Sequence, residues 1–293
     1  MSAPELLASY WTICGAAEPH TDHEHSPFPL RDRAASAARA GFEGLGLWHA
    51  DLAHLRAQHS LAEMHSILAD HGIEHLELEF LTDWFVDGEK RIASDETRRL
   101  LLESAAALGA RHIKVGDFFK TPVPMGKLVE EFAMLCAEAR DHGTRVVFEF
   151  MPFSRIESLE DALALVTGAA QPNGGICVDL WHVVKLGIPY AKVAAFPSQY
   201  LLSIEINDGY LEAPGGMDLV TETTCHRAFC GEGEFDVRGF VATMRAAGYA
   251  GPWGVEVLNR AQRAWPLDDL TSRAFDTTAG QFATLVPGGT WRT

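Results

Sequence analysis

Short apolar runs recur along this chain, and four of them carry a single acidic residue near the carboxyl end of the run. In the run 174–182, the apolar neighbours of Asp179 are typical of a strand that is buried on both faces. An ionised acid is costly in such a strand unless a cation or a hydrogen-bond donor meets it. Equivalent positions in three further runs are held by Glu149 (145–150), Glu205 (201–208) and Glu256 (251–258).

Helical spacing and glycine stops separate these runs from one another. Four earlier segments also have the composition of strands, namely 6–15, 44–52, 73–81 and 111–118. The predicted helices are 30–40, 52–70, 95–108, 127–142, 158–167, 190–195, 237–247 and 267–285.

Eight apolar strands, each followed by a helix or a helical linker, predict an α/β fold with a parallel sheet closed into a (β/α)8 TIM barrel. We expect residues 1–293 to form a single domain, because no change of composition divides the chain. An open doubly wound sheet is the alternative, but the first strand–helix turn lacks a Gly-x-Gly-x-x-Gly sequence. The segment 209–234 is long for a connection and is expected to be a lid or a binding loop.

Charge and cysteine content narrow the class of partner. The chain has 24 Lys and Arg against 40 Asp and Glu, a net charge of −16, which argues against nucleic acid or an anionic membrane. The five cysteines are scattered, as expected of reduced thiols in the cytoplasm. We find no signal peptide and no apolar run of about 18 residues that could span a membrane. A small-molecule partner is therefore expected.

In a barrel the carboxyl ends of all strands face one mouth, so the four acids should converge there. Carboxylates this close repel one another unless a cation holds them together. An all-oxygen set favours Mn²⁺ or Mg²⁺ over Zn²⁺, with Co²⁺ also possible. Lys114, in the strand 111–118, is either a structural partner of the acids or a catalytic acid. The alternative is a set of structural ion pairs.

Histidines near the strand ends are further candidates. His182 follows Asp179 by three residues, so it either orients that carboxylate or contacts substrate. His49 ends the strand 44–52 and is either a core residue or part of the pocket. Aromatic residues that could line the pocket, or instead pack the core, are Trp48, Trp84, Phe85, Phe118, Phe119, Phe153 and Trp181.

Taken together, these residues resemble the xylose-isomerase-like TIM-barrel superfamily of sugar isomerases and epimerases. The resemblance rests on Glu149, Asp179-x-x-His182, Glu205 in 204–208, Arg227 with 231–234, and Glu256. It implies that Glu149, Asp179, Glu205 and Glu256 bind one divalent metal, that Glu149 and Glu256 also move protons, and that His182 and Arg227 hold substrate oxygens. The family usually has His or sometimes Gln where this chain has Glu205, which leaves the metal's identity open.

These expectations predict an isomerase or epimerase that takes a proton from the carbon beside a ketone through a metal-stabilised enediolate. The alternative is a β-elimination lyase or dehydratase acting on a keto-inositol, a dehydroshikimate-like acid or a 3-keto-glycoside. An apurinic endonuclease is opposed by the charge, and a non-catalytic sugar-binding module would leave the acids unexplained. Predicted catalytic residues are Glu149, Glu256, His182 and Lys114, and predicted substrate-binding residues are His49, Arg227, Trp181 and His226.

Association of the chain with itself or with a small partner subunit is left open by the sequence. The apolar segment 84–86 and Trp291 are expected to be exposed and would suit the interface of a homo-oligomer.

Overall fold

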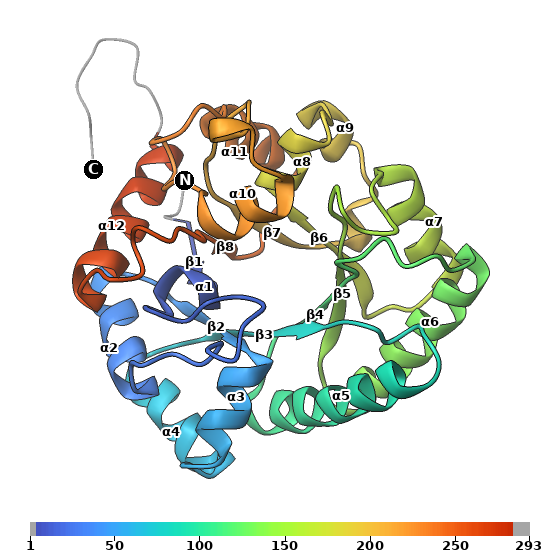
Figure 1. The fold of residues 1–293 in the computed structure, drawn as a ribbon, viewed down its shortest axis with the longest axis horizontal. Helices are drawn as coiled ribbons and strands as arrows, with labels where there is room; N and C mark the ends of the chain where they lie inside the picture. The colour runs from blue at the N-terminus through green and yellow to red at the C-terminus, as the bar shows by residue number, and fades with distance from the viewer. Residues whose placement is uncertain (1–3, 284–293) are drawn as a thin grey trace.

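The computed structural model describes residues 4–283, in which eight parallel strands close into a barrel (Figure 1). Each strand pairs with its neighbours in chain order, and β1 closes the barrel by pairing with β8 as well as β2. The predicted fold class is therefore confirmed. The strands are β1 Leu6–Ala8, β2 Gly44–Trp48, β3 His75–Leu81, β4 His112–Val115, β5 Arg145–Glu149, β6 Gly174–Asp179, β7 Leu201–Ile206 and β8 Trp253–Val255.

Helices form a ring around the barrel, and their apolar faces pack against the outward side chains of the strands (Figure 1). No helix of the described part is long and apolar enough to cross a membrane. The helices are α1 Tyr10–Ile13, α2 Leu30–Ala40, α3 His49–Arg56, α4 Leu61–Asp70, α5 Glu89–Leu108, α6 Met125–Asp141, α7 Leu159–Ala169, α8 Leu180–Lys185, α9 Tyr190–Ala194, α10 Leu219–Cys225, α11 Val237–Ala246 and α12 Leu267–Ala279.

Several predicted elements differ in extent from the structure: the strand 44–52 ends at Trp48, the helix 95–108 begins at Glu89, and the strand 6–15 and the helix 52–70 differ most. The first strand ends at Ala8 and the chain turns into α1, where the Thr12 hydroxyl donates to the Val255 carbonyl at 2.6 Å. The predicted helix 52–70 is two helices, because Ser60 and Glu63 form a capping box that starts α4.

The expectation that residues 84–86 are exposed was also wrong. Trp84 and Phe85 are each only 1% exposed. The Trp84 ring packs against Phe132 of α6 and Phe148 of β5, so this loop turns inward and belongs to the core. Trp291 lies outside the described residues.

The segment after β7 folds over the barrel mouth, where α10 lies inside the ring of outer helices (Figure 1). Asp208 fixes both ends of this segment, because the Asp208 carboxylate accepts hydrogen bonds from the backbone N–H groups of Gly209, Gly231 and Phe235. A backbone bridge between Asp208 and Ala228 adds to this. The predicted long loop is thus an ordered cover held by one buried acid.

Candidate functional site

The four acids do converge at the barrel mouth. Glu149 ends β5, Asp179 ends β6 beside Glu205 of β7, and Glu256 follows β8. One carboxylate oxygen from each lies within 4.8 Å of the others, a grouping that could hold a metal ion. Only Asp179 and Glu205 are register partners, since Glu149 pairs with Cys177 and Glu205 with Gly254. The acids meet because each stands at or near the carboxyl end of its strand, and in a closed parallel barrel these ends face one mouth.

Lys114 reaches this group from β4. Its ammonium lies 2.6 Å from Glu205 Oε1, 2.9 Å from Glu79 Oε2 and 3.1 Å from Glu256 Oε1, and 3.9 Å from Glu149 Oε2. Burial alone would lower the pKa of Lys114, but the surrounding carboxylates hold it well above its ordinary value. The ammonium is therefore the positive centre of a ring of acids.

Asp179 is held by protein donors on both oxygens. Oδ1 accepts from the Trp181 N–H at 2.7 Å, which caps α8, and from the Asn207 amide at 2.9 Å. Oδ2 accepts from Arg227 Nη1 at 2.6 Å. Burial would raise the pKa of Asp179, yet the adjacent Arg227 guanidinium keeps it well below its usual range. Asp179 is thus an ionised anchor for Arg227 and for the start of α8.

Glu205 is fully buried and accepts hydrogen bonds from three other parts of the barrel. Besides Lys114, its Oε1 accepts from the Ser9 hydroxyl at 3.1 Å, and its Oε2 accepts from the Cys177 thiol at 3.4 Å. Burial and the neighbouring Glu256 raise the pKa of Glu205 well above its ordinary value, against the opposing effect of Lys114. Gly254 provides the room, because a Cβ at that position would lie 2.7 Å from Glu205 Cγ.

A divalent metal fits this group by distance, but a metal would compete with the protein donors that most of these oxygens already have. Both oxygens of Asp179 and Glu205 accept hydrogen bonds from protein donors, and Glu256 is shared between Lys114 and Arg227. A divalent ion held by these oxygens would also be repelled by the buried Lys114 ammonium, which lies among the same acids. The four acids are thus already paired with two protein cations, Lys114 and Arg227. The identity of a metal at this site stays a prediction from the sequence.

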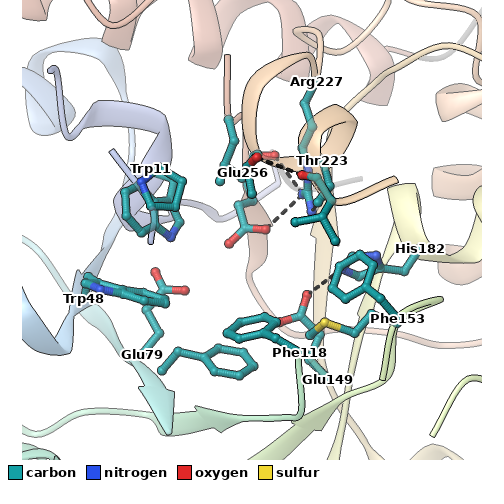
Figure 2. Close-up of a pocket in the computed structure, with 16 residues that line it drawn as sticks. Trp11, Trp48, Glu79, Phe118, Glu149, Phe153, His182, Thr223, Arg227 and Glu256 are labelled. Atoms are coloured by element: carbon teal, nitrogen blue, oxygen red, sulfur yellow. Dashed lines mark hydrogen bonds and ion pairs between the residues drawn. The ribbon is translucent and has the colours of Figure 1, made fainter. Parts of the chain in front are cut away.

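A pocket opens above these acids, with Trp11 and Trp48 on one side and Phe153 and His182 on the other (Figure 2). Its walls are mainly apolar, whereas its floor presents the carboxylates of Glu79, Glu149 and Glu256 (Figure 2). The remaining lining residues are Pro19, Phe80, Phe118, Met151, Val220, Thr223, Thr224, Arg227 and Leu258. Aromatic walls around polar groups suit a flat or cyclic small molecule.

Glu149 is the acid least engaged by other side chains. Its Oε1 lies 3.3 Å from His182 Nε2, and its Oε2 stays 3.9 Å from the Lys114 ammonium. His182 is brought there by the turn from β6 into α8 that Asp179 caps, and Phe153 packs against its ring. A carboxylate beside an imidazole at the edge of a pocket is suited to exchange a proton with a bound molecule.

Glu79 was not predicted as a site residue, yet it lines the pocket floor. Its Oε1 accepts from the Tyr10 N–H at 3.1 Å, and Gly46 leaves space for it, because a Cβ there would lie 3.0 Å from Oε1. Burial raises its pKa to about 8, although Lys114 acts against this shift. Glu79 therefore carries a proton at neutral pH.

We expect Glu79→Gln to change how stability depends on pH. The pKa of Glu79 rises from 4.5 to about 8 on folding, so its stabilising effect is present below the unfolded value and is lost as the pH rises toward 8. The variant should gain stability over the wild type between pH 5 and 8, by at most about 1.4 kcal/mol per pH unit. Urea unfolding at several pH values measures this, and Glu74→Gln at an exposed position is the control.

The other residues predicted for the site lie partly in the pocket and partly outside it. Arg227 lines the pocket, but Trp181 is fully buried beneath Arg227 and not part of the lining. His49 packs against Trp48 with its pKa lowered by burial, and His226 faces a separate hollow next to Tyr210. Of the predicted aromatic lining, the pocket includes Trp48, Phe118 and Phe153, whereas the core contains Trp84, Phe85 and Trp181, and Phe119 is 65% exposed.

Comparison with known proteins identifies relatives of the chain and its family. It is 28% identical over 244 residues to a 3-dehydroshikimate dehydratase of Pseudomonas aeruginosa, a match that covers 81% of this chain but 37% of that protein. The chain thus spans less than half the length of this relative. Its fold matches that of the IOLI protein, solved with a bound zinc atom, with a TM-score of 0.81, 17% identity and coverage of 94% and 97% of the two chains.

A probable 3-DHS dehydratase, AsbF from Bacillus anthracis, matches with a TM-score of 0.72, 15% identity and coverage of 93% and 97%. These likenesses to solved structures concern the fold. The family model described as xylose isomerase-like TIM barrel matches residues 34–277. The chain therefore belongs to the xylose isomerase-like TIM barrel family.

Proposed function

We propose that this protein is a lyase that takes the proton beside a ring ketone and expels the substituent on the next carbon. The observation that carries the proposal is the pair of carboxyl groups facing one pocket, Glu149 beside His182 and Glu79 with its raised pKa. The sequence similarity to a dehydratase supports elimination over the isomerisation that the sequence suggested first.

The proposed reaction uses these two groups in opposite roles. The Glu149 carboxylate removes the proton from the carbon next to the ketone, which leaves an enolate. The enolate electrons form the new C=C bond as the C–O bond to the leaving group breaks, and Glu79 gives its proton to the departing oxygen. The products are an α,β-unsaturated ketone and water, or an alcohol when the leaving group is a glycosidic oxygen.

Other pocket residues bind and orient the substrate in this proposal. Thr223 holds Arg227 through its hydroxyl at 2.8 Å from Nη2, and the aromatic walls exclude water from the enolate. No step depends on a metal ion. The Mn²⁺ expected from the sequence, a cytoplasmic location and a homo-oligomer or partner subunit remain predictions.

The charges around the pocket favour an uncharged cyclic ketone. Among the described residues that line the pocket, Arg227 is the one side chain with a permanent positive charge. It is already paired with Asp179 and Glu256. A substrate carboxylate would therefore meet three acids and no unpaired cation on the pocket floor. We expect keto-inositols and 3-keto-glycosides to react better than 3-dehydroshikimate.

A substrate panel tests the proposal. The protein is incubated with a keto-inositol, a 3-keto-glucoside and 3-dehydroshikimate in deuterated water, and the absorbance of the conjugated ketone is followed together with loss of the β-substituent by mass spectrometry. Formation of the unsaturated ketone supports a lyase. Deuterium uptake with a rearranged ketone that keeps all its oxygens would instead indicate an isomerase and contradict the proposal.

A further inference from the structure

We propose that the Lys114 ammonium takes the place of a resident divalent metal, so that this site is organised by a covalently attached cation. Three carboxyl groups, from β3, β7 and the end of β8, lie within 3.1 Å of its nitrogen, and Glu149 of β5 is next at 3.9 Å. Carboxylates of separate strands thus converge on one amino group, in the way that ligands converge on a metal ion.

The hydrogen bonds of the candidate ligands support this assignment. Asp179 already accepts three hydrogen bonds, from Arg227, Asn207 and the Trp181 N–H. Glu205 has Lys114 as its one cationic neighbour within salt-bridge distance among the described residues, its other donors being a hydroxyl and a thiol. A metal that bound these oxygens would have to compete with the partners that hold them.

Lys114 also lacks a way out of the cluster. Its side chain is 1% exposed, and β4 is enclosed by β3 and β5. A surface lysine could turn into solvent when a metal binds, but this one would remain buried beside the ion. The positive charge under the pocket is therefore monovalent and independent of metal supply.

In this arrangement Lys114 is a positioning residue and not a catalytic one. It does not line the pocket, but it holds the carboxyl groups of Glu79 and Glu256, which do. Its role is to fix those groups at the floor while Glu149, at the longer distance, stays free to accept a proton.

The test measures metal binding and does not depend on the proposed reaction. The full chain is purified without chelator, its metal content is measured by mass spectrometry, and its melting temperature is followed with added Mn²⁺, Zn²⁺ or EDTA. We expect wild-type protein with far less than one metal per chain and a melting temperature that none of these additions changes.

The double variant Lys114→Met, Glu205→His provides the converse experiment, because it removes the ammonium and adds an imidazole, a common metal ligand. It should gain about one Zn²⁺ or Mn²⁺ per chain, with a higher melting temperature in the presence of the ion. Lys185→Met is the matched control, since Lys185 is a largely buried lysine paired with Glu222 away from the four acids, and it should gain no metal.

One result overturns the inference, whether or not the variants fold. It is wild-type protein that carries one metal per chain, loses it in Asp179→Asn and melts at a lower temperature with EDTA. Loss of the lyase reaction across the whole substrate panel, with the metal-free result intact, would contradict the proposed function alone.

Discussion

Replacing Glu149 by Gln is expected to lower kcat on the best substrate of the panel by about 10²- to 10⁴-fold, the usual contribution of a general base. The amide keeps the shape of the side chain but cannot accept the substrate proton. KM should change little, because Glu149 is one of many lining residues and the aromatic walls stay in place. Steady-state kinetics and solvent deuterium exchange measure both effects.

Glu157→Gln is a suitable control for this variant, because Glu157 is a half-exposed acid that pairs with Lys120 outside the pocket. It should keep the wild-type kcat. If Glu149→Gln also keeps its activity and its deuterium exchange, another group removes the proton and the proposed role of Glu149 is wrong.

Replacing Lys114 by Met should have the largest effect on stability. The change leaves the buried carboxylates of Glu205 and Glu256, and the carboxyl group of Glu79, facing one another without their shared cation. Breaking a buried ion pair from one side costs about 3–5 kcal/mol, so we expect a loss of at least this size in the free energy of unfolding. Urea denaturation followed by circular dichroism measures it.

The double variant Lys114→Met, Glu205→Gln should recover much of that loss, since a neutral amide no longer needs a buried counter-charge. Arg39→Met is the control for loss of a cation as such, because its pair with Asp268 is exposed to solvent and should contribute little to stability. An effect of Lys114→Met no larger than that of Arg39→Met would mean that the acids are neutralised in another way.

The sequence was sufficient for the barrel and for the meeting of its four acids. A single acid inside an apolar run is informative because a strand covered on both faces leaves the barrel interior as the one place for a charged side chain. Glu79 escaped notice for a related reason. Alternation of polar and apolar residues in 75–81 resembles a strand with one solvent-exposed face, whereas both faces of β3 are buried.

The contact partners of each buried charged residue could not be predicted from the sequence. Lys114 could be recognised as a buried lysine, but which acids it contacts depends on the register of four strands. The direction of an aromatic side chain in a connecting segment is set by tertiary packing, so the core position of Trp84 and the pocket position of Trp11 could not be read from local patterns.

Gly254 links the barrel wall to its chemistry in a way that bears on evolution. A methyl group at this position would lie 2.7 Å from Cγ of Glu205, so Glu205 can keep its present position only with glycine at 254. Homologues that carry a larger residue at 254 should therefore have a smaller or displaced residue at 205, and a different partner for the lysine at 114. If positions 114, 205 and 254 vary together among homologues, the change would mark the point in the family at which a buried lysine replaced a buried metal ion.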